Sequence, residues 1–107
     1  MALVEEKCKP CQGGEPTLSV AEAEGLGRQV PEWAIEDQAI ERHLKFKDFR
    51  EAMEFVNKVA YAAEEEGHHP DIHISWNKVR LRLTTHKIGG LSRNDFILAA
   101  KIDKLLA

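Results

Sequence analysis

Residues 64–91 read EEEGHHPDIHISWNKVRLRLTTHKIGGL, and they hold four of the five histidines in the chain. A helix is predicted to end at Gly67, because glycine takes the left-handed conformation at a helix C-terminus without a Cβ penalty. Apolar and polar residues then alternate over 72–76 and again over 78–84, which predicts two strands with one buried and one wet face. The apolar positions of the first strand are Ile72, Ile74 and Trp76. A tight turn near Asn77-Lys78 would join the strands, with a positive φ at the asparagine.

The strongest predicted helix precedes this segment and covers residues 48–66. Asp48 is its expected N-cap, and Glu51 stands at the third helical position, as in a capping box. The apolar residues recur at helical spacing. They are Phe49, Met53, Val56, Ala60 and Ala63, with Phe55, Val59 and Ala62 widening the face.

The outer parts of the chain add two helices and a hairpin. Ser19 caps a short helix over about residues 20–29. Residues 33–46 form a hairpin, in which Arg42 falls on the apolar face and lies either near a strand edge or in a polar pocket. Ser92 caps a last helix, whose apolar residues on more than one side suggest a subunit interface. The resulting order, αββαββα, predicts an α+β two-layer sandwich with a four-stranded antiparallel sheet and three helices on one face.

Composition narrows the class of protein. The 107 residues are enough for one domain with one core, and the charged fraction of 31% is ordinary. A net charge of −3 gives no electrostatic reason to bind nucleic acid directly or an anionic membrane. No apolar run approaches the ~20 residues of a membrane span, and no signal peptide is visible, so a cytoplasmic protein is expected.

Residues 1–16 are expected to be a flexible leader, followed by a domain over 17–107. The leader holds Cys8 and Cys11 as a single CxxC pair. Such a pair is compatible with incidental cysteines, a redox pair, or half of a zinc site completed by another chain.

The histidines are the candidate functional residues. His69 and His73 have the spacing of two helical metal ligands, but Pro70 moves His69 out of the α region and the flanking pattern is that of a strand. A metal site of His68, His69 and His86 stays open at this stage, as does a purely structural role. The alternative is acid–base catalysis, since imidazole and imidazolium coexist near neutral pH. His68 and His69 follow a helix end and His86 ends a strand, so both groups are placed to border one cleft.

Three motifs carry a resemblance that covers about residues 17–105. They are Glu64-x-x-x-His68-His69-Pro70, Trp76-Asn77-Lys78-Val79, and Thr84-Thr85-His86-x-x-x-Gly90-Leu91-Ser92-x-x-Asp95. Together with Pro31-Glu32-Trp33 and Phe46-Lys47-Asp48-Phe49, they resemble the pterin-4a-carbinolamine dehydratase family. Gly67 departs from the family pattern, in which the residue before the histidine pair is often acidic.

The resemblance implies a dehydratase that removes water from 4a-hydroxytetrahydropterin without a metal or an organic cofactor. It implies that His68, His69 and His86 are catalytic, with His68 and His86 as the acid–base pair and His69 as an orienting group. Pro70, Thr85, Lys87 and Ile88 would bind the pterin, and Glu64 or Asp95 would orient an imidazole. A homodimer or homotetramer is implied, serving the pathway of a pterin-dependent aromatic amino acid hydroxylase. The alternative function is a non-catalytic dimerising or assembly module on the same fold.

Overall fold

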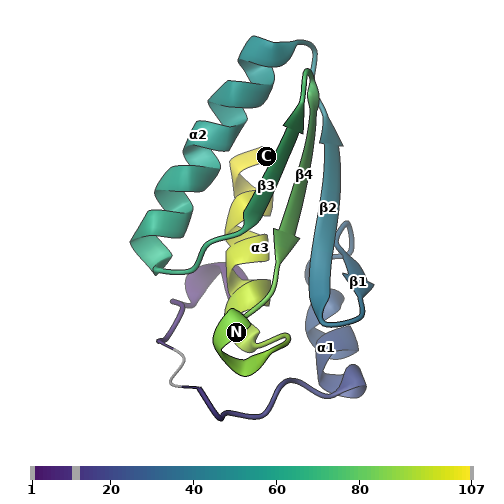
Figure 1. Ribbon diagram of the computed structural model, residues 1–107, viewed down its shortest axis with the longest axis vertical. Helices are drawn as coiled ribbons and strands as arrows, with labels where there is room; N and C mark the ends of the chain where they lie inside the picture. The colour runs from purple at the N-terminus through teal and green to yellow at the C-terminus, as the bar shows by residue number, and fades with distance from the viewer. Residues whose placement is uncertain (1, 11–12, 107) are drawn as a thin grey trace.

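The computed structural model describes residues 2–10 and 13–106, and their element order is that predicted from the sequence. The elements are the 3-10 turn η1 (Leu3–Glu5), α1 (Val20–Gly27), β1 (Ala34–Glu36), β2 (Ala39–Lys45), α2 (Phe49–Glu66), β3 (Asp71–Ser75), β4 (Lys78–Leu83), the 3-10 turn η2 (His86–Ile88) and α3 (Arg93–Leu106). The four strands form one antiparallel sheet in the order β1-β2-β4-β3 (Figure 1). The predicted α+β sandwich is therefore confirmed.

The two faces of the sheet differ in chemistry because side chains alternate along each strand. On the inner face, Ile40 of β2 pairs with Leu83 of β4, and both are fully buried under the helices. On the outer face, His43, Arg80 and His73 stand side by side across β2, β4 and β3, and all three are exposed. His43 and His73 are thus surface groups on the solvent-exposed face of the sheet.

Helix α2 begins and ends where the sequence predicts. The Asp48 carboxylate accepts a hydrogen bond of 2.9 Å from the backbone N–H of Glu51, and Gly67 ends the helix with a φ of 64°. Its buried face is centred on Ala52, Phe55, Val56, Val59 and Ala63. The predicted apolar stripe was therefore displaced by part of a turn: Phe49 is 51% exposed and Ala60 also faces solvent.

Arg42 lies in a polar pocket rather than at a strand edge. Its guanidinium lies 2.5 Å from the Asp103 carboxylate of α3, which also accepts a 2.8 Å hydrogen bond from the indole of Trp33. The carboxylate therefore offsets the cost of placing a cation under the helix layer.

The β3–β4 turn differs from its prediction in one residue. The positive φ of 53° is at Trp76, and Trp76 is 65% exposed instead of lying on the buried face. Asn77 is buried, and its side-chain amide donates a 2.9 Å hydrogen bond to the carbonyl of Phe46. The asparagine is therefore used to fasten this turn to the end of β2.

The last helix and the first residues of the chain cover each other. Of the apolar residues of α3 that suggested a subunit interface, Phe96, Ile97, Leu98 and Ala99 are buried within this chain, and Ala100 is half-buried. The sheet and α2 cover one side of α3, and η1 packs on another, with Leu3 fully buried in the core. The described residues 2–10 are consequently packed against the domain, which differs from the expected flexible leader. Among the described residues, no helix has the length and apolar character needed to cross a membrane.

Candidate active site

The three predicted histidines line one cavity. The cavity measures about 420 Å³, within the ~300–1,000 Å³ typical of small-molecule sites. It lies where the end of α2, the end of β4 with η2, and residues 8–10 near the N-terminus meet. Its lining residues are Cys8, Lys9, Pro10, Glu66, Gly67, His68, His69, Thr84, Thr85, His86, Lys87 and Asn94. The sequence placed both histidine groups at element ends, and the fold brings those ends together.

His68 is held by a buried carboxylate. Its Nε2 lies 2.5 Å from Oδ1 of Asp95, which is fully buried at the start of α3. The other oxygen of Asp95 accepts 2.9 Å hydrogen bonds from the Thr85 hydroxyl and from the backbone N–H of Ser92. Because the Thr85 hydrogen is used in this way, the Ser92 hydroxyl donates to Thr85 across 2.7 Å.

This network fixes the tautomer of His68. A carboxylate that accepts from two other donors accepts from the imidazole as well, so Nε2 of His68 carries a hydrogen. Nδ1 is then the nitrogen left to accept a proton from a ligand. The arrangement of a buried carboxylate behind an imidazole is the one that orients a general base and stabilises the positive charge it acquires.

His69 and His86 are in wetter surroundings. Nε2 of His69 lies 2.5 Å from the Glu64 carboxylate, one turn back on α2, but the two side chains are 58% and 77% exposed. His86 begins η2 and is also exposed. Both carboxylates that the sequence suggested as orienting groups therefore contact an imidazole, in opposite environments.

The predicted pterin-binding residues divide into two groups. Thr85 and Lys87 line the cavity, whereas Pro70 and Ile88 are half-buried and are not among its lining residues. Sequence reasoning did not find Asn94 or the N-terminal residues of the cavity. Asn94 offered one signal, its position beside Asp95, whereas the leader offered none because its pattern has no periodicity.

Two features of the cavity bear on metal and thiol chemistry. Within residues 2–10 and 13–106, no three histidine, cysteine or acidic side chains are arranged to hold a metal ion. Burial, followed by the charge of Glu66, raises the pKa of Cys8 to about 12, so its thiol stays protonated near neutral pH and reacts slowly. Cys11 lies outside the described residues, and the predictions for the CxxC pair stay open there.

Comparisons with known proteins agree with one another. A family model described as "Pterin 4 alpha carbinolamine dehydratase" matches residues 16–105. A protein from Nitrosomonas eutropha is 50% identical over 105 residues, covering 97% of this chain and 93% of the relative. One from Methylococcus capsulatus is 49% identical over 108 residues, covering 99% and 95%. Both are named as candidate pterin-4-alpha-carbinolamine dehydratases.

Two solved structures share the fold. A transcriptional coactivator/pterin dehydratase from Brucella melitensis superposes with a TM-score of 0.81 at 31% identity, covering 85% of this chain and 99% of that one. A pterin dehydratase-like protein described as a RuBisCO assembly factor in the alpha-carboxysome gives a TM-score of 0.57 at 22% identity, covering 68% and 84%, which bears on the fold alone.

The fold and the histidine cavity thus define the chain as an α+β sandwich protein of the pterin dehydratase type. More particularly, the chain belongs to the pterin-4a-carbinolamine dehydratase family.

Proposed function

We propose that this protein removes water from 4a-hydroxytetrahydropterin and releases quinonoid dihydropterin. The observation that carries the proposal is the cavity in which His68, backed by buried Asp95, meets His69 and His86. Family membership supports the reaction class.

The reaction needs one proton added and one removed. The C4a–O bond breaks as a donated proton converts the hydroxyl into water, and the N5–H bond electrons form the C4a=N5 double bond as N5 loses its proton. One imidazolium and one imidazole supply both transfers, each worth about 10²–10⁴-fold in rate. Solvent exchange then restores the two histidines, so the balance needs no metal and no organic cofactor.

The surroundings suggest a division of roles. His68 is assigned as the base at N5, because Asp95 stabilises the imidazolium that forms when Nδ1 accepts a proton. His86 is assigned as the acid at the 4a hydroxyl, since it faces the same cavity from η2 and exchanges protons with solvent. His69 orients the substrate, with Thr85 and Lys87 as further contacts; Pro70 and Ile88 remain predicted contacts outside the cavity lining.

The test is a dehydration assay with purified protein and freshly generated 4a-hydroxytetrahydropterin. The rate should exceed that in buffer and should persist in the presence of a chelator. A rate equal to that in buffer would contradict the proposal, and a sharp loss with chelator would favour a metal-dependent reaction.

A pair of matched double variants sharpens the assay. His68→Ala with His86→Ala should abolish turnover, because the acid and the base are both removed. His43→Ala with His73→Ala removes two histidines from the outer sheet face and should leave the rate unchanged. Turnover that survives in the first pair would show that the roles are wrongly assigned.

The alternative is a non-catalytic assembly or coactivator module on the same fold. The names of the Brucella and carboxysome proteins include such roles. The proposed function also includes a cytoplasmic location, a homo-oligomeric state and a role in the pathway of an aromatic amino acid hydroxylase. The alternative is favoured only if wild-type protein, folded and containing all three cavity histidines, gives no turnover.

A further inference from the structure

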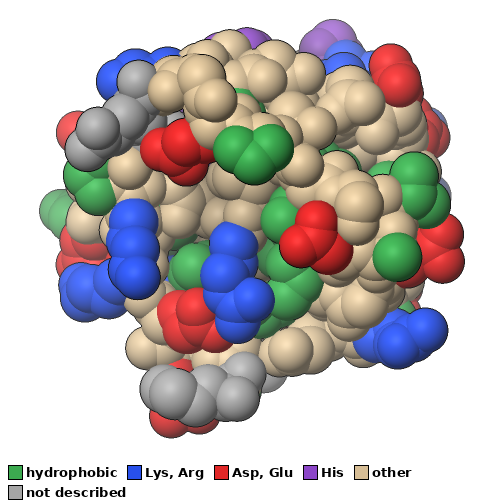
Figure 2. All heavy atoms as spheres, turned by 90° about the horizontal axis from the view of Figure 1, so that it is seen from below, with side chains coloured by type: hydrophobic (Ala, Val, Ile, Leu, Met, Phe, Trp, Pro, Cys, Tyr) green, Lys and Arg blue, Asp and Glu red, His purple; other side chains and the backbone are tan. Residues whose placement is uncertain are grey.

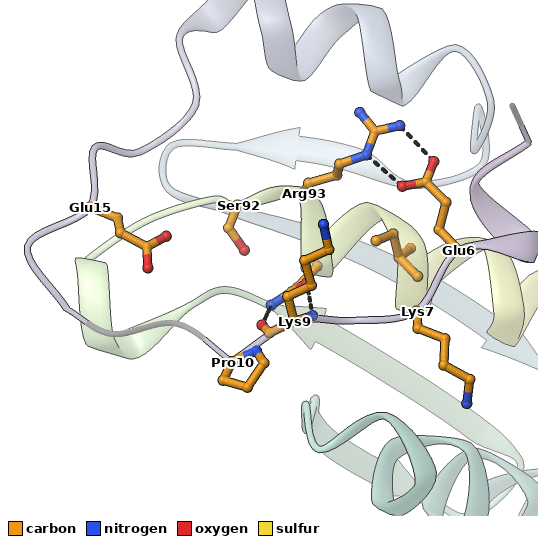
Figure 3. Close-up of a pocket in the computed structure, with 9 residues that line it drawn as sticks. Glu6, Lys7, Lys9, Pro10, Glu15, Ser92 and Arg93 are labelled. Carbon is orange, nitrogen blue, oxygen red and sulfur yellow. Dashed lines mark hydrogen bonds and ion pairs between the residues drawn. The ribbon is translucent and has the colours of Figure 1, made fainter.

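The N-terminal segment, defined here as residues 2–10, runs along α3, from Val4 beside Lys101 to Lys9 beside Asn94 at the start of the helix. Leu3 anchors it in the core. Glu6 and Arg93 form a two-pronged ion pair, with Nε and Nη2 of the arginine 2.8 Å and 2.6 Å from the two carboxylate oxygens. Figure 3 shows these two side chains facing each other, while Lys7 points away. The segment is therefore fixed before it reaches the histidine cavity.

Its last part is held by hydrogen bonds to two elements. The Asn94 side chain binds Lys9 twice: its oxygen accepts from the backbone N–H at 2.9 Å, and its amide donates to the carbonyl at 2.5 Å. The backbone N–H of Cys8 donates to the Glu66 carboxylate across 2.8 Å. The side-chain amide of Asn94 thus pairs with both the backbone N–H and the backbone carbonyl of Lys9, as a neighbouring strand would.

These anchors are close to the residues that position His68. Glu66 is two residues before His68 on the chain, and Asn94 immediately precedes Asp95. The N-terminal segment and His68 are consequently fixed by the same two helix ends.

Lys9 and Pro10 have a hollow on either side. They line the histidine cavity, and they also line a second cavity of about 260 Å³ at the start of α3 (Figure 3). Between the two hollows the segment is thus a thin wall. Seen from this end, acidic and basic side chains are interspersed, so this view shows no continuous surface of one charge that would bind a polyanion (Figure 2).

We propose that residues 8–10 form a wall of the substrate pocket and set how tightly the pterin is held. The family model begins at residue 16, so this wall lies outside the matched core. The thiol of Cys8, which donates a 3.6 Å hydrogen bond to the carbonyl of Asn94, and the apolar ring of Pro10 both line the cavity and are suited to contact a flat bicyclic ligand. A contact made equally with substrate and transition state lowers KM and leaves kcat unchanged. This inference rests on the proposed function.

Protection of Cys8 provides a readout besides activity. In a Cys11→Ser background, the alkylation of Cys8 by iodoacetamide is followed by mass spectrometry with and without saturating dihydrobiopterin. Ligand binding is measured separately by fluorescence quenching. The dihydropterin should slow alkylation several-fold, because a pocket ligand covers the sulfur.

Kinetics test the wall itself. Asn94→Leu removes both bonds to Lys9, and KM should rise about tenfold with kcat within about twofold, since each hydrogen bond is of ordinary strength. Alkylation of Cys8 should become faster in the same variant, because release from burial lowers the thiol pKa toward its ordinary value. Pro10→Ala is a second variant at an exposed position, which preserves the anchors, and its KM should rise about threefold. Lys7→Ala is the control on the same segment, and its kinetics should match the wild type.

Two results overturn the inference and are distinguishable. If dihydrobiopterin binds but Cys8 is alkylated equally fast in its presence, and both wall variants keep the wild-type KM, then the segment is not a wall of the pocket and the proposed function stands. If wild-type protein neither binds dihydrobiopterin nor dehydrates the carbinolamine, the proposed function fails and the inference fails with it.

Discussion

Replacing Asp95 by asparagine tests the pair formed by the His68 imidazole and the buried Asp95 carboxylate without changing its shape. Oδ2 of Asp95 accepts from both Thr85 and Ser92, so the amide oxygen of the variant will take that position. The amide nitrogen then faces Nε2 of His68, where it donates a hydrogen bond. Nε2 must become the acceptor, and the hydrogen moves to Nδ1. A neutral His68 in this tautomer is no longer able to accept a proton from the substrate at Nδ1.

The structure sets the size of the expected losses in stability and in turnover. All three hydrogen bonds persist, the one to His68 with its direction reversed, so the stability loss comes from the missing negative charge, which strengthened that bond and lay at a helix N-terminus. That loss is about 1–2 kcal/mol, or a melting temperature lower by roughly 4–8 °C. A domain with about 5–15 kcal/mol of stability stays folded. Turnover should fall by at least about 100-fold, because general base catalysis contributes about 10²–10⁴-fold.

The assay combines kcat and KM for dehydration with ¹⁵N NMR of the imidazole, which reports which ring nitrogen of His68 carries the hydrogen. Glu64→Gln is the matched control. It alters a histidine–carboxylate pair with the same 2.5 Å separation, but this pair is exposed. Exposed pairs are worth about 0–1 kcal/mol, so kcat should change by less than about fivefold. An Asp95→Asn variant with near wild-type kcat, or an equal loss in both variants, would refute the reasoning.

Three further predictions concern stability. Gly67→Ala forces a side chain into a φ of 64° but meets no atom within 4 Å, so the backbone alone should cost about 1 kcal/mol, seen as a melting temperature lower by about 4 °C. Asp103→Ala leaves the half-buried Arg42 without its carboxylate and should cost about 2–4 kcal/mol in urea unfolding, whereas no loss would show the pocket to be wet. The hydrogen bond and the charge of Arg93 lower the pKa of Glu6 below its ordinary value of 4.5. The ion pair therefore stabilises the N-terminal segment fully at pH values above 4.5, and this stabilisation is lost as the pH falls through the lowered pKa. In that pH range, hydrogen exchange of residues 3–9 should become faster in the wild type and show no such step in Arg93→Gln.

The sequence predicted those parts of the fold that local chemistry decides. Asp48 and Gly67 mark the two ends of α2 because capping and a left-handed residue act within one turn. The strand pairs followed from alternation, since one wet face requires it. Trp76 was misplaced because its alternation with Ile74 continued past the true end of β3 into the turn.

What the sequence could not provide depended on contacts between distant segments. Leu3 is followed by lysines, prolines and glycines, so no periodicity marks it as a core residue. The signal was on α3, whose apolar residues exceed what one sheet face can cover. This excess was interpreted as a subunit interface, and the chain's own first residues cover part of it, since Leu3 packs in the same core. Asn94 escaped notice for the same reason, because its partner is 85 residues away.

The candidate site shows how one dipeptide yields two different groups. His68 and His69 are neighbours, and each has a carboxylate oxygen 2.5 Å from Nε2, so sequence and distance alone do not separate them. Burial does: the charges of Asp95 and His68 interact through a low-dielectric interior, whereas water screens Glu64 and His69. In the proposed reaction, a positive charge on the imidazole would face a buried carboxylate at His68 and a water-screened carboxylate at His69. In the proposed mechanism the proton transfer is therefore assigned to His68, and the exposed His69 is assigned to position the substrate.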